Sequence, residues 1–399
     1  MRWRGHFAGL AVIAALAGAP LQAKDDPVIL APDERLLVLP LEFLVFRSDL
    51  ETVEVVAEKS ELARRNLEGS LHRALHREPG LQFVELPALS VDEAATVREY
   101  TDLMRTMAVS AVFGLRFKTV PWRDKKTWRL DFGIGDGLKF LAERTGVGKA
   151  IFVSGSRFET RIGVYPNTPH HTATENINSR MFSATVIDLR SGDVLAIYSP
   201  VRGLAGEVQD VAGANTWMRA LFDDIPARVR SEPPRDQPPP RKHERHARSI
   251  AGFAIMPPKG WRTTIFGISC FRRHDWLLER ICVDPSLIDR TLRERGLKAA
   301  ADPMELGAIA MEGLKADPMY KGMEVISITK ARVGGRDGFR AELKSRFNIA
   351  NSQRRERHLV YGVMGPDGAY LLRFDAPAIY YFDRHLAEFE AAVSTFELL

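Results

Sequence analysis

Cysteine is nearly absent from this chain, which has only Cys270 and Cys282 in 399 residues. Neither lies near the N-terminus, so no cysteine is placed to carry the lipid of a bacterial lipoprotein. The two flank segment 272–276, which fits the tip of a hairpin. An oxidising compartment permits a disulfide between them. Against it, the alternation of Ile281 and Val283 turns Cys282 away from the inward face. A Cys270–Cys282 disulfide and two separate thiols both stay open.

Long apolar runs are also missing beyond the first 23 residues. The strongest candidate, 36–46, is interrupted by Pro40 and Glu42. It is far shorter than the roughly 18 apolar residues that a membrane span requires. We therefore expect no transmembrane segment in the mature chain.

The N-terminus has the layout of a secretory signal peptide. A basic start, 1–4, precedes the apolar run 7–16, which Gly18 and Pro20 break before the small residue Ala23. This order predicts a signal peptide over 1–23 that is cleaved after Ala23. We expect the mature protein, 399 less 23 or 376 residues, to work in the periplasm.

No catalytic signature is present. Gly133-Ile-Gly-Asp-Gly137 precedes a helix pattern, but it lacks the third glycine of a dinucleotide fingerprint and the Walker lysine–serine pair. A turn with positive φ is the preferred interpretation. Ser154-Gly-Ser156 lacks the glycine spacing of a nucleophile elbow. We expect no catalytic residue and no cofactor.

Two histidine pairs are candidate metal ligands. His170 and His171 lie with Glu175 in one connecting segment, and His72 and His76 are four residues apart on a predicted helix. Neither has the three or four ligands on regular elements that zinc sites use, nor an HExxH pattern. We therefore predict no metal site.

The charge balance is mildly basic, with 56 Lys and Arg against 51 Asp and Glu and a formal net charge of +5. Removing Arg2 and Arg4 with the signal peptide leaves +3. An anionic membrane surface is a possible partner of such a chain, whereas no nucleic-acid motif is present. Arg354-Arg-Glu-Arg-His358 leads into a predicted strand. It is interpreted either as a basic edge for an acidic partner or as a charged edge that prevents aggregation.

A proline-rich segment divides the chain. Residues 231–249 contain five prolines, many charges and no aliphatic side chain larger than alanine. They predict an extended linker between a domain at 24–230 and a domain at 250–399. Two domains on a linker would let one protein bridge two partners.

The first domain alternates between helix and strand patterns. Helices are expected over 57–77 and 90–107, a strand over 111–117 and a hairpin over 181–198. Ser90 and Glu93 form a capping box at the start of the second helix. This order predicts a mixed sheet with helices on its faces.

Four segments of this domain resemble the CsgG-like and TolB-N-terminal-like domains of bacterial envelope proteins. They are LLVLP, LQFVELP, ERTGVGKAIFVSGS and ATVIDLRSGDVLAIYS, between residues 36 and 199. The resemblance implies an assembly or interaction module, not an enzyme. Because no lipobox and no propeller repeats accompany it, a CsgG-type secretion pore and a TolB are not expected.

The second domain predicts an antiparallel sheet with helices at 303–315 and 381–398 and strands that include 338–347, 358–364 and 370–374. It resembles the PsbP-like fold through GFAIMPPKGW, VGGRDGFRAEL and FDAP, all after residue 251. Members of that family mostly bind other proteins, so the resemblance implies a binding role.

The expected fold class is therefore α/β (α+β), with two α/β sandwich domains joined by a Pro-rich basic linker. We expect a non-enzymatic periplasmic protein-binding adaptor or envelope assembly factor. A periplasmic hydrolase with a triad hidden in the tertiary fold, or a lipid or small-ligand carrier, are the alternatives.

Overall fold

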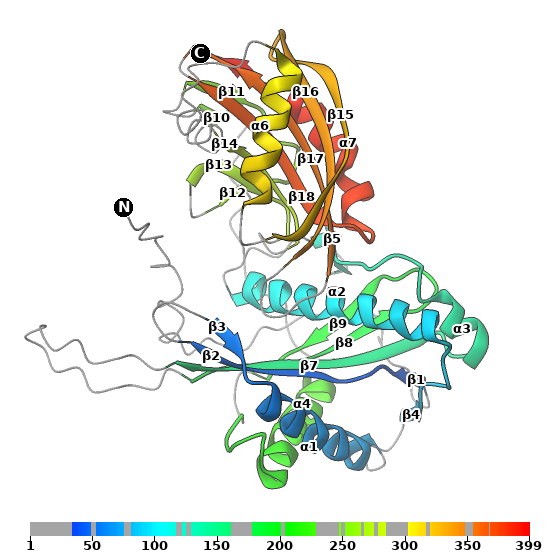
Figure 1. Cartoon of the computed structure of the whole chain (residues 1–399). Helices are drawn as coiled ribbons and strands as arrows, with labels where there is room; N and C mark the ends of the chain where they lie inside the picture. The colour runs from blue at the N-terminus through cyan, green and yellow to red at the C-terminus, as the bar shows by residue number, and fades with distance from the viewer. Residues whose placement is uncertain are drawn as a thin grey trace, which may run out of the picture.

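A computed structural model describes most of the chain (Figure 1). The described residues are 34–48, 53–75, 81–116, 122–124, 129–160, 178–200, 204–228, 247–248, 252–264, 267–274, 278–284, 302–316, 320–347, 354–366 and 368–399. The predicted signal peptide, residues 231–246 of the predicted linker, His76, His170, His171 and Glu175 lie outside them. None of the helices in these ranges has the length and apolarity needed to cross a membrane.

The N-terminal half forms a mixed sheet around the long strand β7. Its elements are β1 (Glu34–Val38), β2 (Glu42–Ser48), β3 (Val53–Val55), α1 (Ala57–Leu75), β4 (Leu81–Val84), α2 (Val91–Arg116), β5 (Trp122–Asp124), β6 (Arg129–Leu130), α3 (Lys139–Thr145), β7 (Lys149–Thr160), β8 (Asn178–Asp188), β9 (Val194–Tyr198) and α4 (Val211–Arg228). β1 and β2 pair with β7 in parallel, one after the other along the same edge. β8 pairs antiparallel with the other edge and continues to β9, so the predicted hairpin is present.

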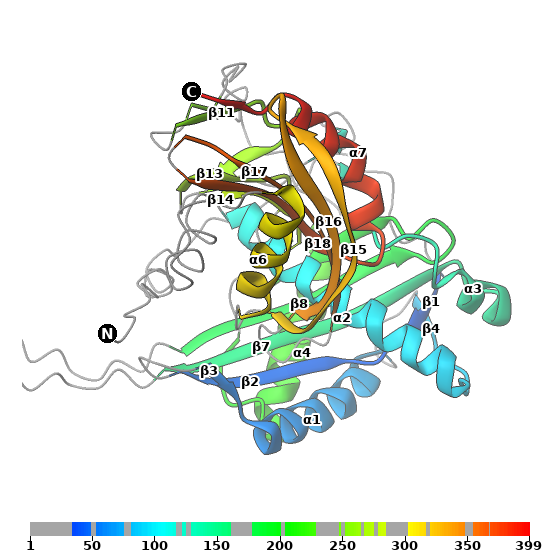
Figure 2. The same cartoon turned by 45° about the horizontal axis from the view of Figure 1, so that its top comes forward.

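Helices cover both faces of this sheet (Figures 1 and 2). α1 and α4 lie together on one face, and α2 lies on the other. The predicted inward stripe of α1 is buried, including Ala63, Leu67 and Leu71. Ser90 and Glu93 make the reciprocal bonds of the predicted capping box at the start of α2. Local sequence thus predicts where these two helices begin.

The strand expected at 111–117 is wrong, because α2 continues to Arg116. Leu103, Met107 and Ala111 recur every four residues, and all three are fully buried. This spacing keeps one apolar stripe of a helix against the sheet beyond residue 107. The helical period therefore extends into a segment whose apolar run had indicated a strand.

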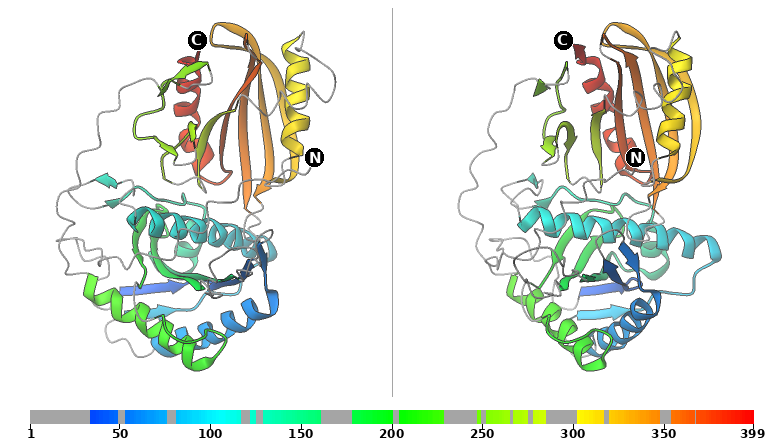
Figure 3. Two further views of the ribbon diagram at one scale, coloured as in Figure 1. Left: turned by 90° about the vertical axis from the view of Figure 1, so that its left-hand side faces the viewer. Right: turned by 60° about the vertical axis from the view of Figure 1, so that its left-hand side comes forward.

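The C-terminal half contains an antiparallel sheet of order β12-β13-β14-β18-β17-β16-β15. Its elements are β10 (Ala247–Arg248), β11 (Phe253–Ile255), β12 (Arg262–Thr264), β13 (Gly267–Arg272), β14 (Arg280–Asp284), α6 (Pro303–Lys315), β15 (Tyr320–Val333), β16 (Arg336–Phe347), β17 (Arg355–Met364), β18 (Ala369–Pro377), α7 (Tyr381–Ser394) and β19 (Glu397–Leu398). α6 and α7 lie on opposite faces of the sheet (Figure 3). The fold class is thus α/β, with one mixed and one antiparallel sheet flanked by helices.

Cys270 and Cys282 form a disulfide in the structure. They are register partners on β13 and β14, and their Cα atoms are 4.1 Å apart. Ile281 and Val283 do face the core, which turns Cys282 to the other face. Cys270 lies on that same other face, so the alternation that had counted against a disulfide is what brings the two sulfurs together.

The two halves are in direct contact. One continuous core cluster contains Leu37, Met104 and Phe132 of the N-terminal half together with Phe253, Phe374 and Phe389 of the C-terminal half. Ala247 and Arg248, at the end of the predicted linker, form β10 and pair with β11. The domain boundaries stay a prediction. A buried polar network lies at the contact between the halves.

Candidate functional site

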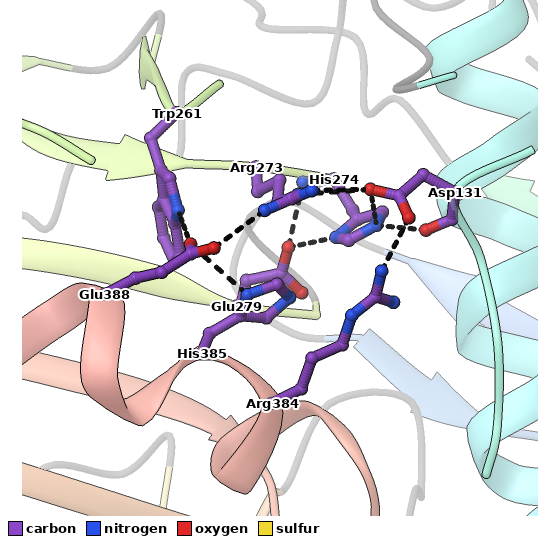
Figure 4. A network of polar contacts seen from close by, with 8 residues as sticks. All are labelled: Asp131, Trp261, Arg273, His274, Glu279, Arg384, His385 and Glu388. Atoms are coloured by element: carbon purple, nitrogen blue, oxygen red, sulfur yellow. Dashed lines mark hydrogen bonds and ion pairs between the residues drawn. The ribbon is translucent and has the colours of Figure 1, made fainter. Parts of the chain in front are cut away.

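Asp131, in the segment between β6 and α3 of the N-terminal half, contacts charged groups of the C-terminal half (Figure 4). Its buried carboxylate accepts hydrogen bonds from Arg273 at 2.8 Å and from Arg384. Its backbone carbonyl oxygen contacts Nε2 of His274. Burial acts to raise the pKa of Asp131, but the guanidinium groups of Arg384 and Arg273 outweigh it and hold the pKa below its ordinary value. Asp131 is therefore ionised in the folded protein.

Glu279 lies at the centre of the network and is completely buried. Its Oε1 accepts the backbone N–H of His274 at 2.9 Å and contacts Nδ1 of the same residue. Its Oε2 has no hydrogen-bond partner. Burial acts to raise the pKa of Glu279, and the charge and hydrogen bonds of His274 lower it further than burial raises it. His274, just after β13, and Glu279, just before β14, are thus in direct contact.

His385 on α7 completes the group and is only 1% exposed. Neither of its ring nitrogens makes a hydrogen bond. Nδ1 faces Oε2 of Glu388 at 3.4 Å, while Glu388 itself accepts from Nε1 of Trp261 at 2.7 Å and from Arg273 at 3.0 Å. Burial lowers the pKa of His385 to about 4, so its imidazole is neutral at pH 7.

Aromatic rings surround these polar groups. The ring of His274 lies 5.0 Å from that of Phe132, 5.4 Å from that of Tyr381 and 5.9 Å from that of His385. Burial raises the pKa of the Tyr381 hydroxyl well above its ordinary value. Within the described ranges, His274, Glu279 and His385 are the group whose donor atoms lie close enough, within 4.8 Å of one another, to hold a metal ion.

The glycine segment 133–137 belongs to the same contact between the halves. Gly135 adopts φ +77°, as the preferred turn interpretation requires. A Cβ atom on Gly133 would lie 2.9 Å from the hydroxyl oxygen of Tyr380, and one on Gly137 would collide with the hydroxyl of Tyr100. The glycines are therefore explained by close packing on aromatic side chains.

The other predicted candidates are not brought together. Ser154 and Ser156 are buried within strand β7, and the Ser154 hydroxyl lies 3.4 Å from that of Ser183. His72 is exposed on α1, with Glu85 at 3.8 Å. Each is accounted for by its place on a strand or on a helix surface.

The interpretation of Arg354–His358 as a strand edge is wrong, since β17 lies between β16 and β18. Arg354, Glu356 and His358 are buried on one face, and the Arg354 Nε bonds Glu356 at 2.8 Å. Arg355 points to the N-terminal half, where it pairs with Glu99. These charges thus join buried or cross-half ion pairs.

A second polar chain crosses three neighbouring strands of the C-terminal sheet. Ser345 Oγ lies 2.8 Å from Nε2 of His358, and Nδ1 of His358 lies 2.8 Å from Oδ1 of Asp375. Because the carboxylate can only accept, His358 donates from Nδ1, and in the neutral imidazole the Nε2 accepts the serine hydroxyl. Arg280 and Arg373 bind the other carboxylate oxygen at 2.8 and 3.0 Å. Burial acts to raise the pKa of Asp375, but the two guanidiniums lower it far below its ordinary range.

Of the residues in these two networks, sequence reasoning singled out only His358, as the end of the basic segment 354–358, although one further signal was available. His385 lies four residues before Phe389, at the spacing of the inward stripe of the terminal helix. A histidine on an apolar helix face needs a partner or a role. The nearness of His274 and Glu279 to it depends on how the turn and the helix pack, and no local pattern contains that information.

No protein-family model matches the chain, and no curated protein matches it. Solved structures that are similar to part of it include the following three. Cyanobacterial PsbP from Synechocystis sp. PCC 6803 is 20% identical, with 37% of this chain and 88% of that chain covered and a TM-score of 0.25. The Ran-binding protein Mog1p of Saccharomyces cerevisiae is 11% identical, with 37% and 90% covered and a TM-score of 0.26. LpqN of Mycobacterium tuberculosis, involved in cell envelope biogenesis, is 12% identical, with 37% and 82% covered and a TM-score of 0.25. One of these is a PsbP, and none is a CsgG-like or TolB-N-terminal-like protein, so the latter resemblance has no support.

Proposed function

We propose that this protein is a non-enzymatic periplasmic adaptor or envelope assembly factor that binds a protein partner along the outer edge of β15. The observation that carries the proposal is Ile326, a large apolar side chain that is 53% exposed on that strand. Among the described strands, β15 pairs only with β16. Its 14 residues therefore present one long edge.

A β-bulge accounts for the exposure of Ile326. The register with β16 shifts between Val325 and Ser327, which leaves Ile326 without a partner across the ladder. Val325 and Ile328 pack on the cluster below α6, whereas Ile326 does not belong to it. Bulges redirect side chains and break an edge that would otherwise pair with any strand. An edge of this kind is suited to a selective contact.

Two charged side chains of β15 form close ion pairs within the protein. Glu324 contacts Lys344 at 2.9 Å and Arg332 contacts Asp337 at 2.7 Å. These exposed pairs add little stability. They place charges of both signs along the edge. An apolar side chain of a partner that packs on Ile326 is therefore not surrounded by charges of one sign.

Site-specific photocrosslinking tests the proposal. The full chain, with a photoreactive residue in place of Ile326, is expressed in its native cells and should crosslink to one discrete envelope protein. The same residue at Leu62, which is exposed on α1, is the matched control. Ile326→Lys should weaken binding of the recovered partner by about 10-fold or more, since a buried isoleucine contributes about 1.5–3 kcal/mol. Identical products at both positions, or full binding by Ile326→Lys, would contradict the proposal.

A hydrolase is the second candidate. Ser345, His358 and Asp375 are linked by hydrogen bonds in the same order as the nucleophile, base and orienting carboxylate of a catalytic triad. Two features favour a structural role instead. Ser345 is only 5% exposed, and two guanidiniums already hold Asp375. A nucleophile must be reached by its substrate, so burial counts directly against catalysis.

A fluorophosphonate probe separates the two candidates. Labelling of the mature chain that is lost in Ser345→Ala would establish an activated serine. Ser183→Ala, at another buried serine, is the control. Folded protein that stays unlabelled while it crosslinks through position 326 would favour the adaptor.

A further inference from the structure

We propose that His274, Glu279 and His385 bind a divalent transition-metal ion, and that zinc is the ion that this ligand set fits best. His274 lies just after β13, Glu279 lies just before β14, and His385 is on helix α7. Each offers one donor atom, and these atoms lie within 4.8 Å of one another. All three side chains are buried. Figure 4 shows the two imidazoles and the carboxylate turned toward one another.

Unpartnered atoms at this point indicate a ligand. Both ring nitrogens of His385 and Oε2 of Glu279 are buried with no hydrogen-bond partner. Leaving a buried polar atom unsatisfied costs about 1–3 kcal/mol. Native proteins satisfy such atoms with protein groups, ordered water or a bound ion. One cation between the two side chains would satisfy an imidazole nitrogen and the free carboxylate oxygen together.

The surrounding contacts orient the ligands as metal sites require. Nε2 of His274 is held by the backbone carbonyl oxygen of Asp131, which leaves Nδ1 directed at Glu279. The carboxylate of Glu388 lies 3.4 Å from Nδ1 of His385. A ligating histidine typically has its other nitrogen held by a carbonyl oxygen or a carboxylate. His274 and His385 both have such a neighbour.

The donor chemistry selects the metal. Imidazole nitrogens suit zinc and its first-row neighbours, whereas calcium and magnesium prefer oxygen ligands. Two histidines and one glutamate hold zinc at known catalytic sites, with water in the fourth position. Because the three side chains here are closed off from solvent and lie against Phe132 and Tyr381, a substrate could not reach the ion, and the ion would act by holding these elements together.

The charge of the network favours a bound cation. Asp131, Glu279 and Glu388 are opposed in the network by the two guanidiniums of Arg273 and Arg384. A cation held by Glu279 and the two histidines would supply further positive charge.

The consequence of the site is a link between the halves. The ion would join the β13–β14 turn to α7, and His274 would pass that restraint to Asp131 in the N-terminal half. Arg273 and Arg384 bind the carboxylate of the same aspartate. Metal binding and the contact between the halves are therefore expected to rise and fall together.

Metal analysis of the mature full-length chain tests the proposal. Protein stripped with a chelator and reloaded with zinc should retain one ion per chain after gel filtration. Cobalt in its place should give the intense visible absorption of a tetrahedral site. Glu279→Gln and His385→Phe should lose the bound ion, while the exposed His72→Ala should keep it. Zinc should raise the melting temperature of the wild type but not of the two site variants.

Three results would overturn the proposal. They are folded wild-type protein that retains no zinc, site variants that retain as much as the wild type, and loss of the ion in His72→Ala. Circular dichroism checks the fold of each variant. If one variant fails to fold, the other and the cobalt spectrum of the wild type decide, since a weak octahedral spectrum also contradicts the site.

Discussion

The phenol ring of Tyr380 lies so close to Gly133 that a Cβ atom there would be 2.9 Å from the Tyr380 hydroxyl oxygen. Gly135 lies under the same ring, with a 3.2 Å distance for its own added Cβ. Tyr380 has φ +67° and is the one non-glycine residue with positive φ in the described ranges. Such a conformation is unfavourable for a bulky side chain and persists only when its surroundings impose it. The contact between the halves is therefore closely fitted on both sides.

Gly135→Ala should destabilise this contact more than an ordinary glycine replacement does. The new methyl group would meet the Tyr380 ring and would also have to adopt φ +77°. The left-handed conformation costs about 1–2 kcal/mol, and overpacking adds about 1–3 kcal/mol. Urea denaturation measures the sum as a loss in the free energy of unfolding.

Gly146→Ala is the matched control, because Gly146 has φ +68° with open space around it. It should show the conformational cost alone. Adding Tyr380→Ala to Gly135→Ala should restore part of the loss, since the double variant removes the close contact. Equal losses of unfolding free energy for Gly135→Ala and Gly146→Ala would mean that steric contact with Tyr380 does not constrain residue 135.

Asp131→Asn should be strongly destabilising. The change removes the charge that compensates Arg273 and Arg384, and breaking a buried ion pair from one side costs about 3–5 kcal/mol. Asp337→Asn, which removes the partner of Arg332 in an exposed pair between β15 and β16, should cost less than about 1 kcal/mol. Thermal and urea unfolding of the two variants provide the comparison. Similar losses at both positions would contradict the role given to Asp131.

The elements that could be predicted from sequence are those whose signals are local. Helix α6 begins and ends where expected, since Asp302 caps it by accepting the backbone N–H of Met304 and Pro303 occupies its first turn. The hairpin of β8 and β9 follows from two apolar runs around a glycine turn. The extension of α2 was missed because an apolar run alone does not separate a helix from a strand.

The order of strands and the sites could not be predicted. Arg354–His358 looked like a strand edge, but β17 is an inner strand because β18 and β14 follow it in space. Ser345, His358 and Asp375 meet only through the registers of three strands. His274 and His385 are brought together from β13 and α7 by tertiary packing. Such information is absent from any single segment.

Asp375 should make stability depend on pH. Burial opposes its ionisation, yet Arg373 and Arg280 hold its folded pKa far below the ordinary value of 3.8. A depressed folded pKa contributes stability that is fully present above the unfolded value and is lost as the pH falls below it. The difference in unfolding free energy between wild type and Asp375→Asn should therefore be large at pH 7 and shrink below about pH 4.

Urea midpoints at a series of pH values from 7 to 3 give this comparison, with the exposed Asp337→Asn as the reference variant. The interpretation requires the wild type to approach Asp375→Asn at the acid end. A difference that stays constant with pH would show that Asp375 acts through packing and not through its charge.

The Cys270–Cys282 disulfide should stabilise the fold and the proposed metal site together. His274 and Glu279 both lie inside the loop that it closes. Constraining a loop of about 15 residues lowers the entropy of the unfolded chain by the equivalent of about 3 kcal/mol. The same bond keeps β13 beside β14, which fixes the turn that carries the two ligands. Cys270→Ala with Cys282→Ala should therefore lower the unfolding free energy by about 2–4 kcal/mol and weaken zinc retention.

Unfolding by urea with and without a reducing agent, followed by zinc analysis of the folded fraction, measures both effects. Asp337→Asn lies outside the loop and is the reference variant. It should lower the unfolding free energy by less than about 1 kcal/mol and leave zinc retention unchanged. If the reduced protein unfolds at the same urea concentration as the oxidised protein, then β18, which pairs with β14, already fixes that strand and the disulfide adds nothing. If reduction lowers stability but leaves zinc bound, the turn between β13 and β14 is held by Asp131 and α7 rather than by the sulfur bond.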